Sequence, residues 1–145
     1  MKIKNVLSDK SRNAIFSVTS KQSVFEALQL MADKNIGAVL VIDDEQLVGI
    51  FSERDYARKV ILQGKSSQQT LVEEVMTSKL ITVSSEQKLE EAMLIMSEKH
   101  IRHLPVVDEG DLKGIISIND VVNSIIRDQK VRIASLESYI SGSPY

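Results

Sequence analysis

The chain contains no cysteine, no tryptophan and only two histidines among its 145 residues. The lack of cysteine excludes disulfides, thiolate nucleophiles and cysteine-based zinc or iron–sulfur sites, and two histidines argue against a His-rich metal centre. No apolar run approaches the roughly 18 residues that a membrane span requires. The first ten residues carry neither an apolar signal core nor an Arg/Ser-rich transit pattern. We therefore expect a cytoplasmic protein with no membrane partner.

The charges are almost balanced, since 18 Lys and Arg face 20 Asp and Glu, a net charge of −2. No global positive field exists to attract nucleic acid, so we expect none as a partner, and any anion site must be local. Apolar residues make up 43% and charged residues 26%, which is typical of a globular protein. The length suits one ordinary domain or two small halves folded together.

An internal repeat organises the sequence. Residues 17–56 align without a gap with residues 82–121, and 15 of the 40 aligned positions are identical. A short segment of similar sequence, which we call the lead-in, precedes each copy: Val6-Leu7-Ser8 before the first and Val75-Met76-Thr77 before the second. We predict a first repeat with its lead-in over 1–70, a second repeat over 71–128 and a C-terminal helical extension over 129–145.

Both copies predict the same order of elements. Apolar residues at helical spacing predict one helix per copy, and Ser23 with Glu26 is typical of a capping box for the first. Two β-branched runs follow in each copy, at 36–42 and 47–52 and again at 101–107 and 112–117, with acidic turns between them. The fold class is therefore α+β, with two βαββα repeats that we expect to pack sheet to sheet about a pseudo-two-fold axis.

The C-terminal segment predicts a helix that outlasts the second copy. Apolar steps of three and four residues continue without Gly or Pro as far as Gly142. These positions are Val121, Val122, Ile125, Gln129, Ile133, Leu136 and Ile140. Such a stripe needs a partner surface, either a second chain or the helix's own module if the helix folds back.

The same short pattern ends the second strand of each copy, Gly49-Ile50-Phe51-Ser52-Glu53-Arg54-Asp55 and Gly114-Ile115-Ile116-Ser117-Ile118-Asn119-Asp120. In one interpretation, Ser is a helix N-cap and Asp is a favourable first-turn carboxylate. In the other, the helix N-terminus suits a phosphate while the carboxylate accepts the two hydroxyls of a ribose. The two interpretations are compatible.

Taken together, the duplicated unit, the Val75-Met76-Thr77 lead-in, the strand Arg102-His103-Leu104-Pro105-Val106-Val107-Asp108 and the two junctions resemble a tandem pair of cystathionine-β-synthase (CBS) domains, or Bateman module, of the stand-alone two-CBS kind. The resemblance implies an adenine nucleotide, AMP, ADP, ATP or NAD, bound in clefts between the repeats. It places Asp55 and Asp120 on ribose hydroxyls, and Ser52 and Ser117 near ribose or phosphate. It also assigns phosphate to Arg102 and His103, and adenine to Ile36, Gly37, Ala38, Thr82 and Pro105.

The two copies differ where charge matters. Gly37 and Ala38 stand in the first copy where Arg102 and His103 stand in the second, and Arg54 stands where Asn119 does. A guanidinium facing a phosphate makes forked, charge-assisted hydrogen bonds. We therefore predict that the cleft containing Arg102, His103 and Asp120 binds a nucleotide better than its counterpart.

Two hypotheses about function follow. The first is a homodimeric regulatory sensor whose nucleotide changes its conformation and thereby the response of an unknown protein target. The second is a ligand-free dimerisation or protein-interaction scaffold, in which the junctions are only helix caps. No nucleophile–base pair is visible in the sequence, so we do not expect an enzyme.

Overall fold

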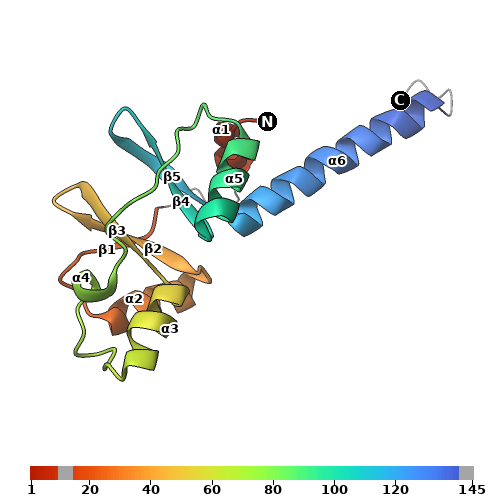
Figure 1. Cartoon of the computed structure of the whole chain (residues 1–145). Helices are drawn as coiled ribbons and strands as arrows, with labels where there is room; N and C mark the ends of the chain where they lie inside the picture. Colours follow the sequence, from red (N-terminus) through yellow and green to blue (C-terminus); the bar gives the residue numbers. More distant parts are fainter. Residues whose placement is uncertain (10–14, 141–145) are drawn as a thin grey trace. The chain divides into compact units, whose positions relative to one another are not determined.

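The computed structural model describes residues 1–9 and 15–140, and these form two compact units (Figure 1). The first-copy unit contains residues 15–82. The second-copy unit contains residues 1–9 together with 83–140. Each unit is built around one small sheet with helices packed on it, as the α+β fold class predicted.

The first-copy unit has a three-stranded sheet in the order β1-β2-β3, in which β1 runs parallel to β2 and β3 runs antiparallel to it. Its elements are β1 (Ser17–Val18), α2 (Val24–Lys34), β2 (Ala38–Asp43), β3 (Gln46–Ser52), α3 (Glu53–Lys59), a 3-10 turn (Ile61–Gln63) and α4 (Val72–Val75).

The second-copy unit repeats this plan with one strand reduced. Its elements are α1 (Ile3–Asp9), α5 (Leu89–Lys99), β4 (His103–Asp108), β5 (Asp111–Ser117) and α6 (Ile118–Ile140). The place of β1 is taken by a single parallel bridge between Val83 and Val106. The predicted order of strand, helix, strand, strand, helix is thus present in the first copy, and in the second copy the first strand is reduced to this bridge.

The helices α2 and α5 pack one apolar face against the sheet of their own unit. The buried residues lie three and four apart, Val24, Ala27 and Met31 in α2, and the corresponding positions in α5 are buried too. Both helices end at a residue in the left-handed conformation, Asn35 and His100, which closes the last turn. The predicted capping box of α2 is half formed, because Ser23 Oγ accepts from the Glu26 N–H at 3.1 Å while the Glu26 carboxylate accepts from Gln22.

Each strand pair closes through a two-residue turn with both residues at positive φ. The turn is Asp44-Glu45 in the first-copy unit and Glu109-Gly110 in the second. This is the backbone of a type I′ turn, which matches the twist of the flanking strands. The acidic turns predicted from the sequence are therefore tight hairpins, and they hold the two strands of each pair in register.

The lead-ins are exchanged between the copies, which differs from the boundaries that the repeat predicts. The segment before the first copy docks on the second-copy unit, where the Ile3 and Lys4 N–H groups donate to the carbonyls of Gln87 and Ser85. The segment before the second copy docks on the first-copy unit, where Thr77 exchanges both backbone hydrogen bonds with Ile50. Residues 1–9 thus belong with the second repeat and 71–82 with the first.

The exchanged lead-in packs closely against a glycine in the sheet of each unit. A Cβ on Gly49 would lie 2.6 Å from Met76 Sδ, and a Cβ on Gly114 would lie 3.0 Å from Leu7 Cδ2. Because a side chain would fill this space, the repeated glycine serves close packing of the lead-in against the strand.

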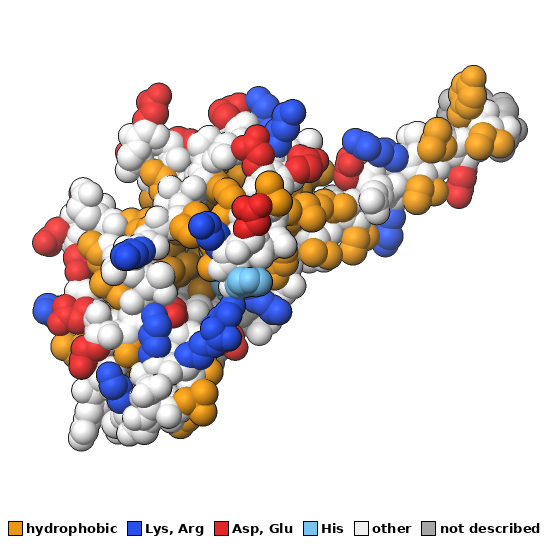
Figure 2. All heavy atoms as spheres, in the orientation of Figure 1, with side chains coloured by type: hydrophobic (Ala, Val, Ile, Leu, Met, Phe, Trp, Pro, Cys, Tyr) orange, Lys and Arg blue, Asp and Glu red, His pale blue; other side chains and the backbone are white. Residues whose placement is uncertain are grey.

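Helix α6 runs without interruption from the junction through the predicted extension, so 129–140 is a continuation of the second repeat's own helix. Its first turns hold the buried residues Val121 and Ser124. Farther on, Ile133, Leu136 and Ile140 keep 55%, 61% and 81% of their surface exposed. Figure 2 shows hydrophobic side chains spread along this helix. Within residues 1–9 and 15–140, the distal part of α6 does not fold back over its own module, which was one of the two predicted ways to cover the stripe.

Candidate functional site

In the first-copy unit, strand pairing brings the predicted residues of one copy to the start of α3. Ala38 pairs with Ser52 in the β2–β3 register, and the Glu53 N–H donates to the Gly37 carbonyl at 3.0 Å. Ile36 precedes them and is half-buried, while Ala38 is buried. Gly37, Ala38, Ser52 and Asp55 therefore surround one strand-to-helix junction.

The second-copy unit repeats this geometry at the start of α6. His103 pairs with Ser117, and the Ile118 N–H donates to the Arg102 carbonyl at 2.9 Å. The Ser117 N–H donates to Asp120 Oδ2 at 2.8 Å, and the Asp120 N–H donates to Ser117 Oγ at 3.1 Å. This reciprocal pair caps the helix, as the mechanical interpretation predicted.

Exposure differs among the predicted ligand residues. Arg102 and Asn119 are exposed, His103 is half-buried, and Pro105 is buried within β4. In the first-copy unit, Arg54 is exposed, and so is Thr82, which is the last residue of that unit. The second-copy junction thus offers a guanidinium, an imidazole and a carboxylate within a few residues, whereas the first-copy junction offers Gly37 and Ala38 at the equivalent strand positions.

The Asp55 carboxylate is already engaged on both oxygens. Oδ2 accepts from the Ser52 N–H at 3.0 Å and from Ser52 Oγ at 3.1 Å, while Oδ1 accepts from Thr77 Oγ1 at 3.2 Å and pairs with Lys59 Nζ at 3.0 Å. A carboxylate offers about four lone-pair sites. Four donors therefore occupy its acceptor capacity, and this side chain is only 13% exposed.

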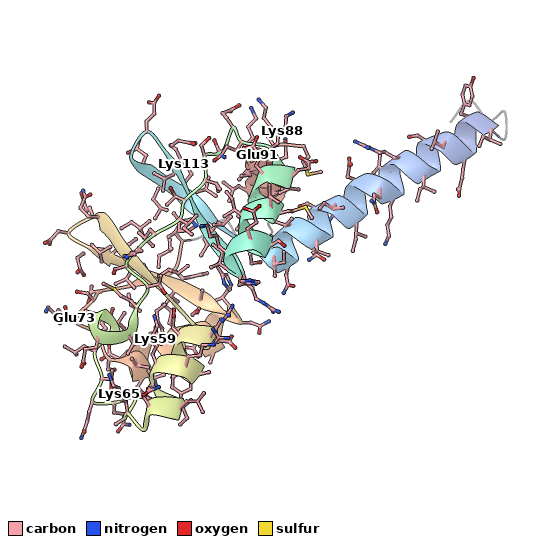
Figure 3. The ribbon with its side chains drawn as sticks, viewed as in Figure 1. Lys59, Lys65, Glu73, Lys88, Glu91 and Lys113 are labelled. Carbon is pink, nitrogen blue, oxygen red and sulfur yellow. The ribbon has the colours of Figure 1, made fainter. Side chains whose placement is uncertain are left out.

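Lys59 is a residue of the first-copy junction that the sequence analysis missed. It lies in the last turn of α3, where Figure 3 labels it, and its ammonium also donates to the Val75 carbonyl at 3.1 Å and to Thr77 Oγ1 at 3.5 Å. The spacing of Asp55 and Lys59, four residues apart on one helix, was the available signal. At the equivalent position of the second copy stands Ser124, which is buried. The two junctions are therefore chemically unlike.

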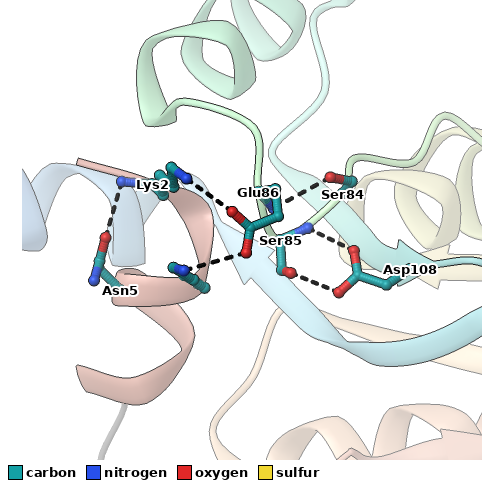
Figure 4. Close-up of polar contacts among 7 residues, drawn as sticks. Lys2, Asn5, Ser84, Ser85, Glu86 and Asp108 are labelled. Atoms are coloured by element: carbon teal, nitrogen blue, oxygen red, sulfur yellow. Dashed lines mark hydrogen bonds and ion pairs between the residues drawn. The ribbon is translucent and has the colours of Figure 1, made fainter.

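Two further carboxylates fix the loops before α2 and α5. Hydrogen bonds from the side chain and backbone of Ser85 hold the pKa of the Asp108 carboxyl below its ordinary value, and Ser20 does the same for Asp43. Figure 4 shows Asp108 with Ser85. These groups anchor structure, and none of them was a predicted ligand.

The exchanged N-terminal lead-in is held by charge. The ammonium groups of Lys2 and Lys4 pair with Glu86 at 2.8 and 3.2 Å (Figure 4). Side-chain hydrogen bonds from both lysines lower the pKa of the Glu86 carboxyl. All three side chains are about half exposed or more, so these pairs orient the lead-in and add little stability.

A model of the CBS domain family matches the chain twice, over residues 4–61 and 72–127. The chain belongs to the CBS domain family. Pairs of CBS domains are regulatory modules. Among the residues that the structure describes, no helix combines the length and the apolar character that crossing a membrane requires.

Curated relatives share most of the chain. It is 38% identical over 148 residues to the mitochondrial CBS domain-containing protein CBSX3 of Arabidopsis thaliana, covering 97% of this chain and 72% of the relative. It is 34% identical over 115 residues to the CBS domain-containing protein YhcV of Bacillus subtilis (strain 168), covering 79% of this chain and 81% of that protein.

Solved structures agree on the fold. A candidate signal-transduction protein with CBS domains from Burkholderia ambifaria MC40-6 is 47% identical with a TM-score of 0.86, over 89% of this chain and 96% of that one. The CBS domain pair of protein MJ0100 is 26% identical with a TM-score of 0.78, over 88% of this chain and 98% of that one. That pair was solved in complex with 5′-methylthioadenosine and S-adenosyl-L-methionine.

Proposed function

We propose that the chain is a regulatory sensor that binds an adenine nucleotide, AMP, ADP, ATP or NAD, and changes the response of a protein partner. The observation that carries the proposal is the second-copy junction, where Arg102, Ser117 and Asp120 gather at the start of α6. The related pair of MJ0100, which binds two adenosyl compounds, supports an adenosine ligand as the class.

In the proposed complex, each group at the second-copy junction takes the part of the ligand that its chemistry suits. The Asp120 carboxylate accepts the two ribose hydroxyls, Ser117 lies near ribose or phosphate, and the Arg102 guanidinium binds phosphate through charge-assisted hydrogen bonds. His103 adds a donor to the phosphate, and Asn119 adds a neutral polar group beside it. The adenine contacts implied by the family resemblance stay predictions.

The first-copy junction is the weaker site in this proposal. Its carboxylate, Asp55, can accept ribose hydroxyls only after Lys59 and Thr77 release it, because its acceptor positions are filled. Gly37 and Ala38 bring no charge to a phosphate there, although Arg54 lies on the first turn of the helix. The uncharged residues at 37 and 38 thus support the predicted preference for the second-copy junction.

A sensor needs a ligand that binds one arrangement of the protein better than another. Equal affinity for two arrangements would leave their populations unchanged, however tightly the nucleotide bound. We propose no bond chemistry, since the function requires only binding and a change of conformation. We also propose that the sensor is a cytoplasmic homodimer.

The test is thermal unfolding of the full chain with AMP, ADP, ATP, NAD, GTP and S-adenosylmethionine. A ligand at about 100 times its dissociation constant stabilises the folded state by about 2.7 kcal/mol, a shift of several degrees at this size. We expect Asp120→Ala and Arg102→Ala to lose the shift. The control Lys113→Ala removes an exposed cation from the same unit near the far end of β5, and should keep it.

The exposed apolar length of α6 favours a second function, a dimerisation or interaction scaffold without ligand. In that case no compound of the panel shifts the unfolding temperature. Asp120→Ala then lowers stability only by the loss of a helix cap, about 1 kcal/mol.

A further inference from the structure

The exposed face of α6 carries a regular apolar pattern. Alternating steps of four and three residues connect six positions that we call the α6 seam, namely Val122, Ile126, Gln129, Ile133, Leu136 and Ile140. This 3.5-residue repeat is the one by which two helices pack knobs into holes, with five of six positions apolar. The exposure of the seam rises along the helix, from 42% at Val122 to 81% at Ile140.

From this pattern we infer that the distal half of the α6 seam pairs antiparallel with the same helix of a second copy of the chain. This inference specifies the surface of the proposed homodimer and is independent of the proposed ligand. In this pairing Ile133 packs against the partner's Leu136, and Gln129 lies against the partner's Ile140. Each contact occurs twice, because the two-fold axis crosses between residues 134 and 135.

The charges that flank the seam fit this orientation. Lys130 and Glu137 border one side of the seam, seven residues apart, so an antiparallel partner sets Lys130 of each chain opposite the partner's Glu137. On the other side Arg132 lies opposite the partner's Tyr139, whose ring can accept a cation. The predicted ion pair and the predicted cation–π contact both lie at the rim of the interface, where they select orientation more than they add affinity.

A parallel pair would fit these charges less well. The segment that holds Arg127, Asp128, Lys130 and Arg132 carries two net positive charges, and a parallel partner sets it beside its own copy. A parallel pair would also form one kind of ion pair, Arg132 with the partner's Glu137, but it would align the two helix dipoles. Antiparallel pairing sets Lys130 beside the partner's Glu137, separates the two basic segments and opposes the dipoles. The net charge of the segment and the helix dipoles together favour the antiparallel arrangement.

The experiment is sedimentation of the full chain over a concentration series up to about 100 µM, with two variants of matched exposure. Leu136→Glu places a charge in the seam, whereas Val131→Glu places the same charge on the opposite face of the helix; the two wild-type residues are 61% and 66% exposed. Because both sites are exposed, neither change threatens folding, and circular dichroism checks this. We expect Leu136→Glu to raise the dimer dissociation constant about tenfold or more and Val131→Glu to leave it within about twofold.

Charge exchange tests the orientation. Lys130→Glu should weaken the antiparallel dimer, and the double variant Lys130→Glu with Glu137→Lys should restore it, since the ion pair re-forms with its signs reversed. In a parallel dimer the Glu137→Lys change would instead set a second cation opposite the partner's Arg132. The double variant would then stay weak, which would overturn the inference.

The remaining outcomes separate this inference from the proposals above. A wild-type dimer that Leu136→Glu leaves intact overturns the seam and keeps the homodimer, which then uses another surface. A wild-type chain that is monomeric throughout the series overturns both. The ligand proposal is untouched by either result, because thermal shifts with nucleotide test it on the same variants.

Discussion

Replacing Asp55 should lower the stability of the first-copy unit without removing the ligand response. Asp55→Ala deletes half of the capping box of α3 and leaves Lys59 and Thr77 without the carboxylate that they contact. Loss of the capping box costs about 1 kcal/mol, and the hydrogen bonds of this mostly buried carboxylate add about 1 to 2 kcal/mol. We therefore expect the free energy of unfolding to fall by about 2 to 3 kcal/mol.

The ion pair alone accounts for a smaller part of that loss. Lys59→Met keeps the length of the side chain and removes its charge, and since the lysine is 43% exposed the expected cost is about 0.5 to 1 kcal/mol. The double variant with Asp55→Ala should cost less than the two single changes together, by a coupling of similar size. Urea denaturation of the four proteins, followed by circular dichroism, measures this cycle.

The same variants decide which junction binds. Asp55→Ala should keep the nucleotide-dependent thermal shift, whereas Asp120→Ala should lose it. If Asp55→Ala abolished the shift and cost less than about 1 kcal/mol of stability, its carboxylate would be a ligand group and the argument from filled acceptor positions would be refuted.

Three further predictions concern the stability of the fold. Glu45→Gly relieves a positive φ in the first hairpin, so the free energy of unfolding should rise by about 0.5 to 1 kcal/mol, as urea denaturation would show; a fall would contradict the strain. Gly49→Ala brings a methyl group within 2.6 Å of Met76 Sδ and should lower the free energy of unfolding by about 1 to 3 kcal/mol. An unchanged midpoint of urea denaturation would mean that the lead-in moves aside without cost. The lowered pKa of Asp108 means that the unfolded chain binds its proton more readily, so this contribution is complete above the ordinary carboxyl pKa and is lost as the pH falls below about 4. Ser85→Ala should make the unfolding midpoint depend less on pH in this acid range. An unaltered dependence would mean that other carboxyl groups, and not Asp108, cause the loss of stability in acid.

Local patterns predicted each element of the fold because each element depends on neighbours in sequence. The offset between the copies located both strand pairs, and the turns at Asp44 and Glu109 followed from acidic clusters between β-branched runs. The same patterns predicted the fold class and the strand-to-helix junctions, and the family resemblance then supplied the ligand and the roles of the junction residues. The pairing of one sheet with the other stays a prediction.

The exchange of lead-ins and the engagement of Asp55 were not predicted, and both depend on contacts between distant residues. Thr77 reaches Asp55 across 22 positions of the chain, and no periodicity encodes such a contact. Gly49 and Gly114 were found as parts of a repeated motif. The structure explains why both positions are glycine, because a lead-in packs closely against the strand at each of them. Local propensity describes elements, while the docking of segments depends on surfaces that exist only after the elements have formed.

The exchanged lead-ins also decide which of the two units can fold first while the chain is being synthesised. The first-copy unit is one continuous stretch, 15–82 in its described part, inserted within the chain of the second-copy unit. It can complete its fold as soon as its own residues leave the ribosome. The N-terminal lead-in is made first but must wait for partners such as Glu86, which lies 84 positions after Lys2. At about 5 to 20 residues per second, that wait lasts roughly 4 to 17 seconds, and during this time Ile3 and Val6 expose the apolar side chains that they later bury.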